Sequence, residues 1–406
     1  MMNVNTDKWT EYELGELLSY EQPTPYIVES TDYDDKYDIP VLTAGKSFLL
    51  GYTNEEHGIY DRLPVIIFDD FTTASQYVNF KFKVKSSAMK ILQPNTELVL
   101  PKFIYYRMQI IQFDHSTHKR YWIQQYSKIK VSVPPLDLQK QIVTKIEELL
   151  SQLDDGVETL NKTKEQLKVY RQAILKEAFE GNFTKLKREK INIDIEECSK
   201  EETNKLPKLP PEWKYVHLNK LGDLGRGKSK HRPRNDARLF EDGKYPFLQT
   251  SEVKNADKYI TEYSKMYGEF GLAQSKLWPK GTLCITIAAN IAETAFLGID
   301  ACFPDSVVGF TPNENTNPFY IKYFIESQKL RLWAFAPATA QKNINLDTLE
   351  NLVVPYCGRV EQDEVVKEIE SRMSVCDGIE RTIDLSLQQA EALRQSILKK
   401  AFEGKL

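Results

Sequence analysis

One stretch of this chain has the residue spacing of a phosphate-binding loop. The letters GDLGRGKS place Gly222, Gly227, Lys228 and Ser229 in P-loop order, and a P-loop holds nucleotide phosphates with backbone amides and its lysine. Such a loop must lead directly into a helix, because the free amides at a helix N-terminus bind the phosphate. The next residues, KHRPRNDAR, contain Pro233 and no apolar stripe. The sequence therefore favours a basic loop, with a P-loop NTPase as the alternative function.

The same loop has the composition of a nucleic-acid contact. Lysine and arginine side chains bind the phosphates of DNA without reading its sequence. An exposed, solvated loop is the other interpretation. The candidate phosphate contacts are Arg226, Lys228, Lys230, Arg232 and Arg234.

A second candidate contact, HKRYWIQQYSK (118–128), mixes bases, aromatics and glutamines. Basic residues there could hold phosphates, and a glutamine could hydrogen-bond the edge of an adenine. Trp122 and Ile123 fit core packing as well as DNA contact. The segment AQKNIN (340–345) lies at the matching place in the second half of the chain. The candidates are Lys119, Arg120, Gln124 and Gln125, with Gln341, Lys342 and Asn343 as their equivalents.

Other chemistry is poorly supported. NPFY (317–320) resembles the motif that holds a flipped base in amino-methyltransferases, but it lacks the second proline and follows no glycine-rich loop. We interpret it as a helix start with Pro318 in the first turn. The five histidines show no metal-ligand spacing. The five cysteines are dispersed without a CxxC pair, which indicates reduced thiols in a cytoplasm. We therefore expect no catalytic residue and no metal.

Bulk composition allows two or more domains. The chain has 406 residues, 41% of them hydrophobic and 28% charged, and shows no apolar run of membrane-spanning length. The net charge is only −4, but its distribution is uneven. Residues 11–70 hold fourteen acidic and three basic residues, whereas residues 78–130 hold two and ten. Local fields decide where a polyanion binds, so we expect double-stranded DNA as a partner and no membrane.

One of these basic segments has a strand pattern. YVNFKFKVK (77–85) alternates apolar and basic residues. In an extended strand, alternation sends the two kinds of side chain to opposite faces. The pattern predicts one strand with Lys81, Lys83 and Lys85 together on its DNA-facing side.

Two long helices must position these segments. Residues 135–181 place apolar residues at gaps of three, four and seven, which form a narrow stripe on a helix roughly 60 Å long. Residues 361–404 repeat the pattern: seven apolar positions of the first stripe recur 223 residues later. RQAILKEAFEG (171–181) matches RQSILKKAFEG (394–404) at nine of eleven positions. This similarity indicates an internal duplication, and each narrow stripe needs the other helix as a partner.

The duplication covers the whole chain. Trp9 corresponds to Trp213, Pro40 to Pro246 and Pro101 to Pro318, with a growing offset that indicates small insertions. We expect a mixed α/β fold: two globular domains joined by two antiparallel coiled-coil helices, with a pseudo-twofold internal repeat. Duplex DNA has matching symmetry. The predicted domains are 1–134 and 212–355, the helices 135–181 and 356–406, and the linker 182–211. A coiled-coil scaffold without DNA binding is a further alternative.

This arrangement resembles the specificity (S) subunit of Type I restriction–modification systems over essentially the whole chain. The resemblance rests on the tandem order of domain and helix and on the repeated RQ(A/S)ILK(E/K)AFEG segment. YEQPTPYIV, IPVLTAGKSFLLGYTNEEHGIY, VIIFDDFTTASQYV and KVKSSAMK also match one subgroup of its target recognition domains. One departure is PYCGRVEQ (355–362), two residues longer than PPLDLQ, which predicts a longer loop before the second helix.

The resemblance implies a non-catalytic subunit. Each domain would read half of a bipartite DNA site, while the helices would dock two methyltransferase (M) subunits and, with them, restriction (R) subunits. S-adenosylmethionine, ATP and Mg²⁺ would be bound by these partners and not by this chain. The resemblance adds Thr43, Lys46, Thr72 and Ser86 as DNA contacts.

The helices supply the remaining candidates. An apolar strip outside the seam suggests a second contact surface, and we expect partner docking at Leu175, Phe179, Leu398 and Phe402. The expected helix-pairing residues are Ile142, Ile146, Leu153, Leu160, Leu167, Ile174, Val365, Ile369, Ile379, Ile383, Leu393 and Ile397.

Overall fold

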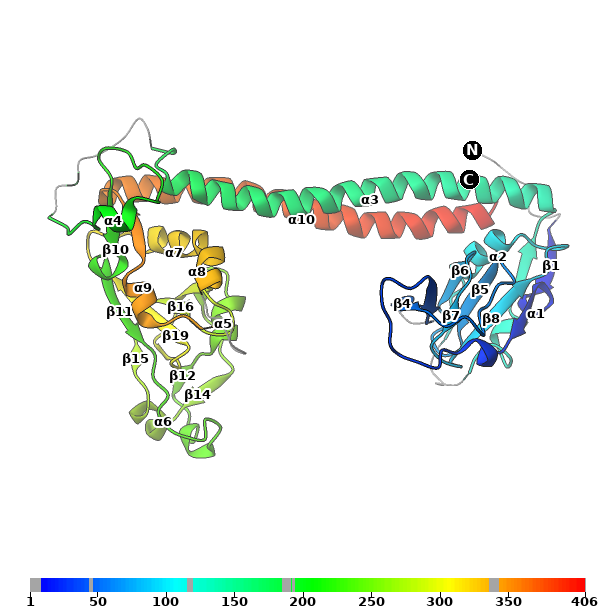
Figure 1. Ribbon diagram of the computed structural model, residues 1–406, viewed down its shortest axis with the longest axis horizontal. Coiled ribbons are helices and arrows are strands. Elements are labelled where there is room, and N and C mark those ends of the chain that lie inside the picture. Colours follow the sequence, from blue (N-terminus) through cyan, green and yellow to red (C-terminus); the bar gives the residue numbers. More distant parts are fainter. Residues whose placement is uncertain are drawn as a thin grey trace. The chain divides into compact units, whose positions relative to one another are not determined.

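The computed structural model describes residues 9–43, 47–114, 120–184, 191, 194–335 and 343–405. It divides into two compact units. Unit 1 is Met1–Lys162 with Thr382–Leu406, and unit 2 is Thr163–Arg381. Each unit contains a globular domain and parts of two 44-residue helices, α3 (Leu136–Phe179) and α10 (Arg359–Phe402) (Figure 1). No helix among the described residues is long and apolar enough to cross a membrane.

The domain of unit 1 is built on a four-stranded antiparallel sheet in the order β2-β8-β5-β6, beside a three-stranded sheet β4-β3-β7 and the pair β1-β9. Its strands and helices are β1 (Thr10–Glu13), α1 (Leu14–Leu17), β2 (Leu18–Glu21), β3 (Ile39–Leu42), β4 (Leu49–Thr53), β5 (Val65–Asp69), β6 (Ser75–Val78), β7 (Lys83–Val84), β8 (Met89–Pro94), α2 (Pro101–Met108) and β9 (Lys130–Val133).

Strand β5 shows why this sheet is buried on both faces. Its side chains alternate: Ile66 and Phe68 enter a core shared with α2, α3 and the end of α10, whereas Val65 and Ile67 enter a second core beneath β3 and β7. Alternation of this kind follows from the pleat of a strand. The first core fastens the domain to both long helices.

Unit 2 repeats this plan with more strands, in a five-stranded sheet β11-β19-β16-β17-β13, a four-stranded sheet β14-β12-β18-β15 and the pair β10-β20. Its elements are α4 (Lys200–Thr203), β10 (Lys214–His217), β11 (Gly222–Arg226), β12 (Tyr245–Phe247), α5 (Thr250–Asn255), β13 (Tyr259–Ile260), β14 (Lys265–Tyr267), α6 (Glu269–Ala273), β15 (Leu277–Trp278), β16 (Leu283–Thr286), β17 (Thr294–Leu297), β18 (Ala301–Cys302), β19 (Val307–Pro312), α7 (Pro318–Ser327), α8 (Lys329–Phe335), α9 (Leu346–Glu350) and β20 (Val353–Tyr356).

The two helices pair antiparallel within each unit. In unit 1, residues near the start of α3, such as Ile146, share a core with Ile397 and Ala401 at the end of α10. In unit 2 the end of α3, at Phe179, shares a core with Val365 near the start of α10. Because the start of one helix meets the end of the other in both units, the two helices run in opposite directions. The predicted mixed α/β fold with two domains and paired long helices is confirmed.

Each long helix ends in the same capping motif. Gly181 and Gly404 have positive φ angles of 75° and 70°. The amide of Asn182 donates to the carbonyl of Glu177, and that of Lys405 donates to Lys400. These bonds define a Schellman cap, in which glycine is favoured because it lacks a Cβ. The repeated AFEG sequence is therefore a helix stop signal.

A buried glutamine fixes α3 to its domain. Gln139 is fully buried, and its side-chain oxygen accepts a hydrogen bond from the Leu100 amide at 2.7 Å. Its amide nitrogen donates to the carbonyls of Leu98 and Pro134 at 2.9 and 2.8 Å. One side chain thus satisfies three backbone groups at the start of α2 and α3.

Gln362 makes the corresponding three bonds in unit 2. Its oxygen accepts from the Asn317 amide at 2.7 Å, and its nitrogen donates to the carbonyls of Cys357 and Asn315 at 2.8 and 3.3 Å. Asn317 also caps α7 through its side chain, so the NPFY segment is a helix start, as its proline predicts.

Two local predictions from sequence are wrong. The run 77–85 is not one strand: β6 ends at Val78 and β7 begins at Lys83, and Phe80 is exposed. The loop before the second helix is not longer either. Both α3 and α10 begin after two residues that follow β9 and β20 respectively. The comparison of PYCGRVEQ with PPLDLQ placed Pro355 opposite Pro134, but Cys357 is the structural equivalent of Pro134. The backbone carbonyls of Cys357 and Pro134 each accept a hydrogen bond from the equivalent buried glutamine.

The described parts of the segment 182–211 lie against unit 2. Ile191 and Ile195 pack on its core. The Trp213 indole and the Thr184 hydroxyl both donate to the buried carboxylate of Glu361, at 3.0 and 2.5 Å. This segment therefore packs as part of the second unit despite its polar composition.

Candidate nucleic-acid interface

The loops of unit 1 that carry candidate DNA contacts meet at Asp70. This residue is 2% exposed. Its backbone carbonyl accepts from the Tyr121 amide at 2.9 Å, and its carboxylate accepts from the Trp122 amide at 2.8 Å. The loop that follows β5 is thereby joined to the segment 120–128.

A buried ion pair supports this junction. Lys90, 1% exposed, places its ammonium 3.6 Å from the other carboxylate oxygen of Asp70. Burial lowers the pKa of Lys90, while the charge of Asp70 opposes that shift. Since a buried charge is costly without its partner, loss of either side chain would loosen the loops.

Several predicted contacts are brought together around the junction. Arg120 lies 6.0 Å above the ring of Phe71, next to Thr72. The Asp70 amide donates to the carbonyl of Ala88, which brings the turn containing Ser86 to the same place. Gln124 and Gln125 are exposed in the adjoining turn. Lys119 lies outside the described residues.

Two further candidates adjoin this cluster. The Lys85 amide donates to the carbonyl of Leu42 at 3.0 Å, so Lys85 lies beside Thr43 at the end of β3. Lys81 is exposed on the connection between β6 and β7. Lys46 lies outside the described residues. Of the two ambiguous residues, Trp122 is core, at 1% exposure, and Ile123 is surface, at 55%.

Lys83 was predicted from sequence as a DNA contact, and the structure corrects that prediction. Its side chain is buried, pairs with Glu55 at 2.7 Å and donates to the backbone carbonyl of His57 at 2.6 Å. A lysine committed in this way has no ammonium to offer a phosphate. The predicted three-lysine face fails because the chain leaves the strand between Val78 and Lys83.

The P-loop-like segment of unit 2 is not a nucleotide site. Its first glycine lies inside β11, which pairs with β19. A Cβ at Gly227 would lie 2.3 Å from the carbonyl oxygen of Pro304, so the glycine allows close strand packing. Ser229 is buried, and the residues after it, through Asp236, form a loop of bends and turns, so Lys228 and Ser229 do not open a helix. The requirement for a helix N-terminus fails.

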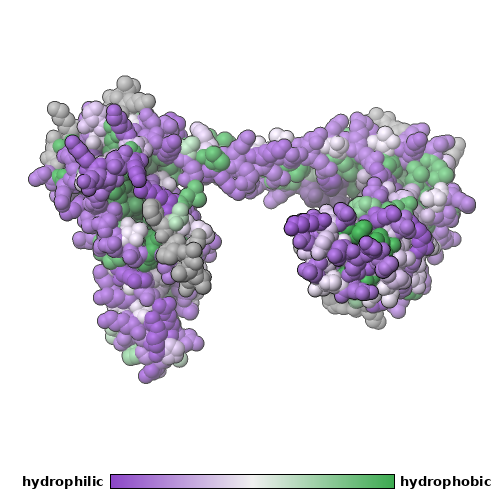
Figure 2. All heavy atoms as spheres, in the orientation of Figure 1, coloured by the Kyte–Doolittle hydropathy of each residue, from purple (hydrophilic) through white to green (hydrophobic). Residues whose placement is uncertain are grey.

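The basic side chains of this segment are exposed instead. Arg234 pairs with the Asp305 carboxylate at 2.8 Å, and Arg226 donates to the Asp305 carbonyl. Arg232 folds back onto the Ser229 carbonyl at 2.6 Å. Lys228 and Lys230 are exposed between them. Figure 2 shows hydrophilic side chains over most of the visible face of this domain.

A pocket of 370 Å³ beside this segment contains residues that the sequence analysis missed. It is lined by Gln249, Thr250, Lys265 and Arg234, among others. Gln249 lies two residues after the end of β12 and Thr43 lies one residue after the end of β3. The alignment of IPVLT with YPFLQ pairs these two residues and was the signal that could have identified Gln249. Amide, hydroxyl and ammonium groups in one hollow are suited to contacts with base edges and phosphates.

Asn343 occupies the place of Arg120. The Ile344 amide donates to the Ile287 carbonyl at 2.9 Å, which repeats the bond from Tyr121 to Asp70. Asn343 is exposed next to this bond. Gln341 and Lys342 lie outside the described residues.

The prediction of exposed docking residues on the helices is also corrected by the structure. Leu175, Phe179 and Leu398 are 3%, 6% and 3% exposed, and each belongs to the core of a unit. The Phe179 ring packs edge-on against Tyr320 and Phe324. Their contacts are with this chain, so they offer no surface to a partner.

Phe402 also makes its contacts within this chain. Its ring packs against Phe103 at 5.1 Å, and the Arg107 guanidinium lies 5.7 Å from it. Phe402 is thus the counterpart of Phe179 in unit 1. The repeated AFEG end anchors each long helix on the domain of its own unit.

The seam predicted between the helices is only partly correct. Most of its residues are buried or half-buried, and some of them belong to the cores of the two domains. Leu167 and Ile174 of α3 pack against Cys376 of α10. Ile379 and Leu393 are 42% and 50% exposed. Tyr170, the equivalent of Leu393, is 51% exposed, so this position lies outside the seam in both copies.

The helices therefore leave a different set of apolar side chains exposed. Those that are at least half exposed are Val169, Tyr170, Val360 and Val375 in unit 2, and Leu385 and Leu393 in unit 1. Their exposed fractions range from 50% to 71%. Their exposure means that none of the segments described in the structure covers them.

Comparison with known proteins places these features in a family. Residues 6–169 and 210–389 match the model of the Type I restriction modification DNA specificity domain. The chain is 31% identical to the Type I restriction enzyme EcoR124I/EcoR124II specificity subunit of Escherichia coli, over 94% of this chain and 92% of that one. It is 27% identical to the EcoBI specificity subunit of Escherichia coli, over 68% and 58% of the two chains.

Two solved structures share the fold. One, from a study of complex assembly and conformational transition of the type I R-M system, superposes with a TM-score of 0.71 at 18% identity and covers 98% of both chains. The other, the HsdS subunit from Thermoanaerobacter tengcongensis, gives 0.55 at 18% identity with the same coverage.

Proposed function

Because this chain belongs to the Type I restriction modification DNA specificity family, as a specificity subunit, we propose that its two domains read the two halves of one asymmetric, bipartite duplex site. The observation that carries the proposal is the repetition of one loop junction with different side chains. Arg120 stands in one domain where Asn343 stands in the other. Equivalent frames with unlike loops are suited to two unlike half-sites.

The proposed contacts fall into two groups by the chemistry of their side chains. Lys81, Lys85 and Arg120 in unit 1, and Lys228 and Lys230 in unit 2, are exposed cations suited to phosphates. Gln124, Gln125 and Gln249 carry amides that can bind an adenine edge in the major groove. The first group would set affinity and the second would set sequence preference.

The chain itself would be non-catalytic. Methyl transfer, ATP hydrolysis and cleavage would reside in methyltransferase and restriction subunits, which would bind S-adenosylmethionine, ATP and Mg²⁺. The exposed side chains Tyr170 and Leu393 occupy the same position of the two copies, so two identical methyltransferase subunits could each dock there. This docking surface replaces the buried one predicted from sequence.

Mapping methylated adenines in DNA from cells that carry this gene tests the reading proposal. We expect one asymmetric motif with two specified parts and an unspecified spacer. A single uninterrupted motif, or methylation unchanged when the gene is deleted, would contradict it. A fluorescence titration with that duplex at several salt concentrations then measures the phosphate contacts directly.

A further inference from the structure

A thiol, a carboxylate and an imidazole converge at the base of unit 2. Cys198, Glu202 and His217 each place one donor atom within 4.8 Å of the donor atoms of the other two. Cys198 and Glu202 come from the segment before and within α4, whereas His217 ends β10. The three are separated by up to nineteen residues in sequence, which is why their spacing matches no metal motif.

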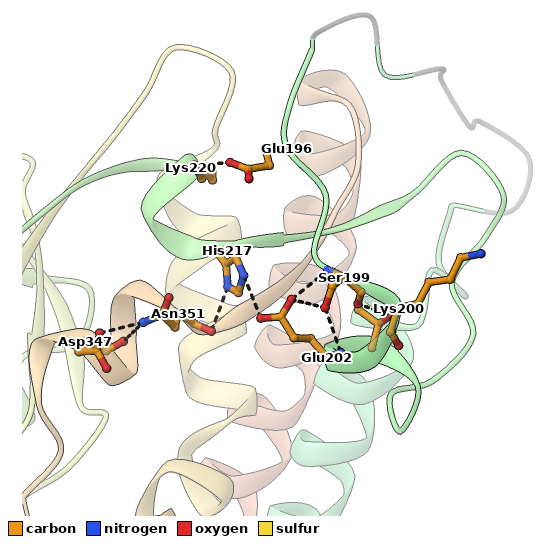
Figure 3. A network of polar contacts seen from close by, with 9 residues as sticks. Glu196, Ser199, Lys200, Glu202, His217, Lys220, Asp347 and Asn351 are labelled. Atoms are coloured by element: carbon orange, nitrogen blue, oxygen red, sulfur yellow. Dashed lines mark hydrogen bonds and ion pairs between the residues drawn. The ribbon is translucent and has the colours of Figure 1, made fainter.

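Hydrogen bonds leave the imidazole facing two acceptors. In Figure 3, His217 lies between Asn351 and Glu202: its Nδ1 is 3.2 Å from the Asn351 carbonyl, and its Nε2 is 3.3 Å from Glu202 Oε1. Neither oxygen can donate a hydrogen bond. With Nδ1–H donated to the carbonyl, a neutral imidazole directs its Nε2 lone pair at the carboxylate, and either a second proton or a metal ion at Nε2 makes that contact favourable.

The surrounding contacts hold the donors in place. The other carboxylate oxygen of Glu202 accepts from the Ser199 amide and hydroxyl at 2.9 and 2.8 Å, so Oε1 remains directed at the imidazole. The Cys198 amide donates to the Tyr215 carbonyl at 2.8 Å. The neighbouring carboxylates are committed elsewhere: Glu196 pairs with Lys220, and Glu197 with Lys214 (Figure 3 shows the first pair).

We propose that Cys198, Glu202 and His217 bind a zinc-type divalent transition-metal ion. Sulfur, nitrogen and oxygen are the ligands that Zn²⁺ takes, with donor separations of roughly 3.3–3.8 Å in a tetrahedral site. Three protein ligands would leave the fourth position to water. Mg²⁺ and Ca²⁺ prefer sites made of oxygen alone, so the thiol and imidazole select against them.

Binding must remove the thiol proton. Cysteine binds a metal ion as the thiolate, so the metal–sulfur bond forms as the thiol proton leaves to solvent. The carboxylate donates a lone pair and releases no proton, and Nε2 of a neutral imidazole does the same. Starting from the thiol and the neutral imidazole, binding releases one proton per metal ion.

A bound metal ion would hold the segment 182–211, which connects the two domains, against unit 2. Cys198 and Glu202 lie on that segment, and His217 lies on a strand paired with β20, which leads into α10. A shared metal would link them and stabilise unit 2 against local opening, because a ligand that binds only the folded form raises its stability.

Titration of the full-length, untagged protein with Zn²⁺ and Co²⁺ tests this site. We expect one ion per chain, a thiolate-to-cobalt absorption band, and no binding of Mg²⁺. Cys198→Ser should abolish the band. Cys198→Ser, Glu202→Gln and His217→Ala should each weaken binding by more than about tenfold, since even outer-shell changes cost 10–100-fold.

His231→Ala is the matched control: His231 also pairs with a carboxylate, Asp236 at 2.7 Å, but belongs to no three-donor cluster among the residues that the structure describes. It should bind metal as the wild type does. Wild-type protein that takes up no ion, or Cys198 and His217 variants that bind equally well, would overturn the proposal. If Cys198→Ser fails to fold, Glu202→Gln and His217→Ala decide alone. Duplex binding is measured in parallel, so loss of DNA recognition is scored separately.

Discussion

Arg171 donates to the carboxylate of Asp377 at 2.7 Å, and the equivalent residues in the other unit repeat the bond with exchanged roles: Arg394 donates to Asp154. Arg171 and Arg394 are copies of one another, as are Asp154 and Asp377. Exchange of partners in this way is the signature of an isologous, twofold contact. It places the two copies of the long helix antiparallel within both units.

The first prediction concerns this contact. A double-mutant cycle on Arg171→Ala and Asp377→Ala should give a coupling of about 0.3–1 kcal/mol, because both side chains are partly exposed. The free energy of unfolding in urea is the measurement. The control cycle, Arg171→Ala with Asp154→Ala, should be additive. Coupling in the control but not in the test pair would indicate another register.

A larger loss is expected at the buried glutamines. Gln139→Leu removes partners from one buried amide and two carbonyls, at about 1–3 kcal/mol for each group left unsatisfied. Gln362→Leu should cost a similar amount because its three bonds are equivalent. Denaturant unfolding measures both. Gln395→Leu, an exposed position on α10, should change little; equal losses at all three positions would contradict the assignment.

Substitution of the repeated phenylalanines separates anchoring from docking. Phe179→Ala should destabilise unit 2 by about 3 kcal/mol, in the range for a buried aromatic, and Phe402→Ala should cost less because it is half-exposed. Tyr170→Ala and Leu393→Ala should leave stability unchanged but weaken binding of the methyltransferase subunit. Co-elution on size exclusion measures that binding. Undiminished binding by the double variant Tyr170→Ala/Leu393→Ala would exclude this docking surface.

The lysines of unit 1 give a matched test of DNA contact. Lys81→Ala and Lys85→Ala should each reduce the slope of log affinity against log salt by about 0.9, the value for one lost phosphate contact. Lys83→Ala should leave the slope unchanged and lower the unfolding free energy, because its buried ammonium pairs with Glu55. A reduced slope for Lys83→Ala, with no change for the other two, would reverse the assignment.

Acid should weaken the same ion pair. Burial acts to raise the pKa of Glu55, but the hydrogen bonds from Lys83 and from the Ser30 and Glu29 amides outweigh it and lower the pKa below its ordinary value of about 4.5. The folded form therefore gains stability from ionised Glu55 above that value, and loses it as pH falls through the lowered pKa.

Unfolding measured between pH 3 and 7 should show this loss in the wild type and a smaller one in Glu55→Gln. Glu56→Gln, an exposed neighbour, serves as the control and should follow the wild-type curve. If Glu55→Gln and wild type lose stability in parallel, the ion pair does not contribute to the acid response.

The sequence by itself determined the duplication, the two long helices and the family. Stripe spacing and the repeated RQ(A/S)ILK(E/K)AFEG are local or repeated signals, and such signals are readable without coordinates. The sequence also favoured a basic loop over a P-loop, because Pro233 and the missing stripe argue against a helix after Ser229, and the structure then excluded the P-loop.

Only the tertiary structure decided which side chains are free to act. Lys83 and Lys85 have the same residue type and the same spacing pattern, yet one is buried in an ion pair and the other is exposed. Phe179 has the pattern of a docking residue but packs on its own domain. Burial and partners depend on segments far apart in the chain, such as the one that brings Cys198 to His217, and no local pattern records that proximity.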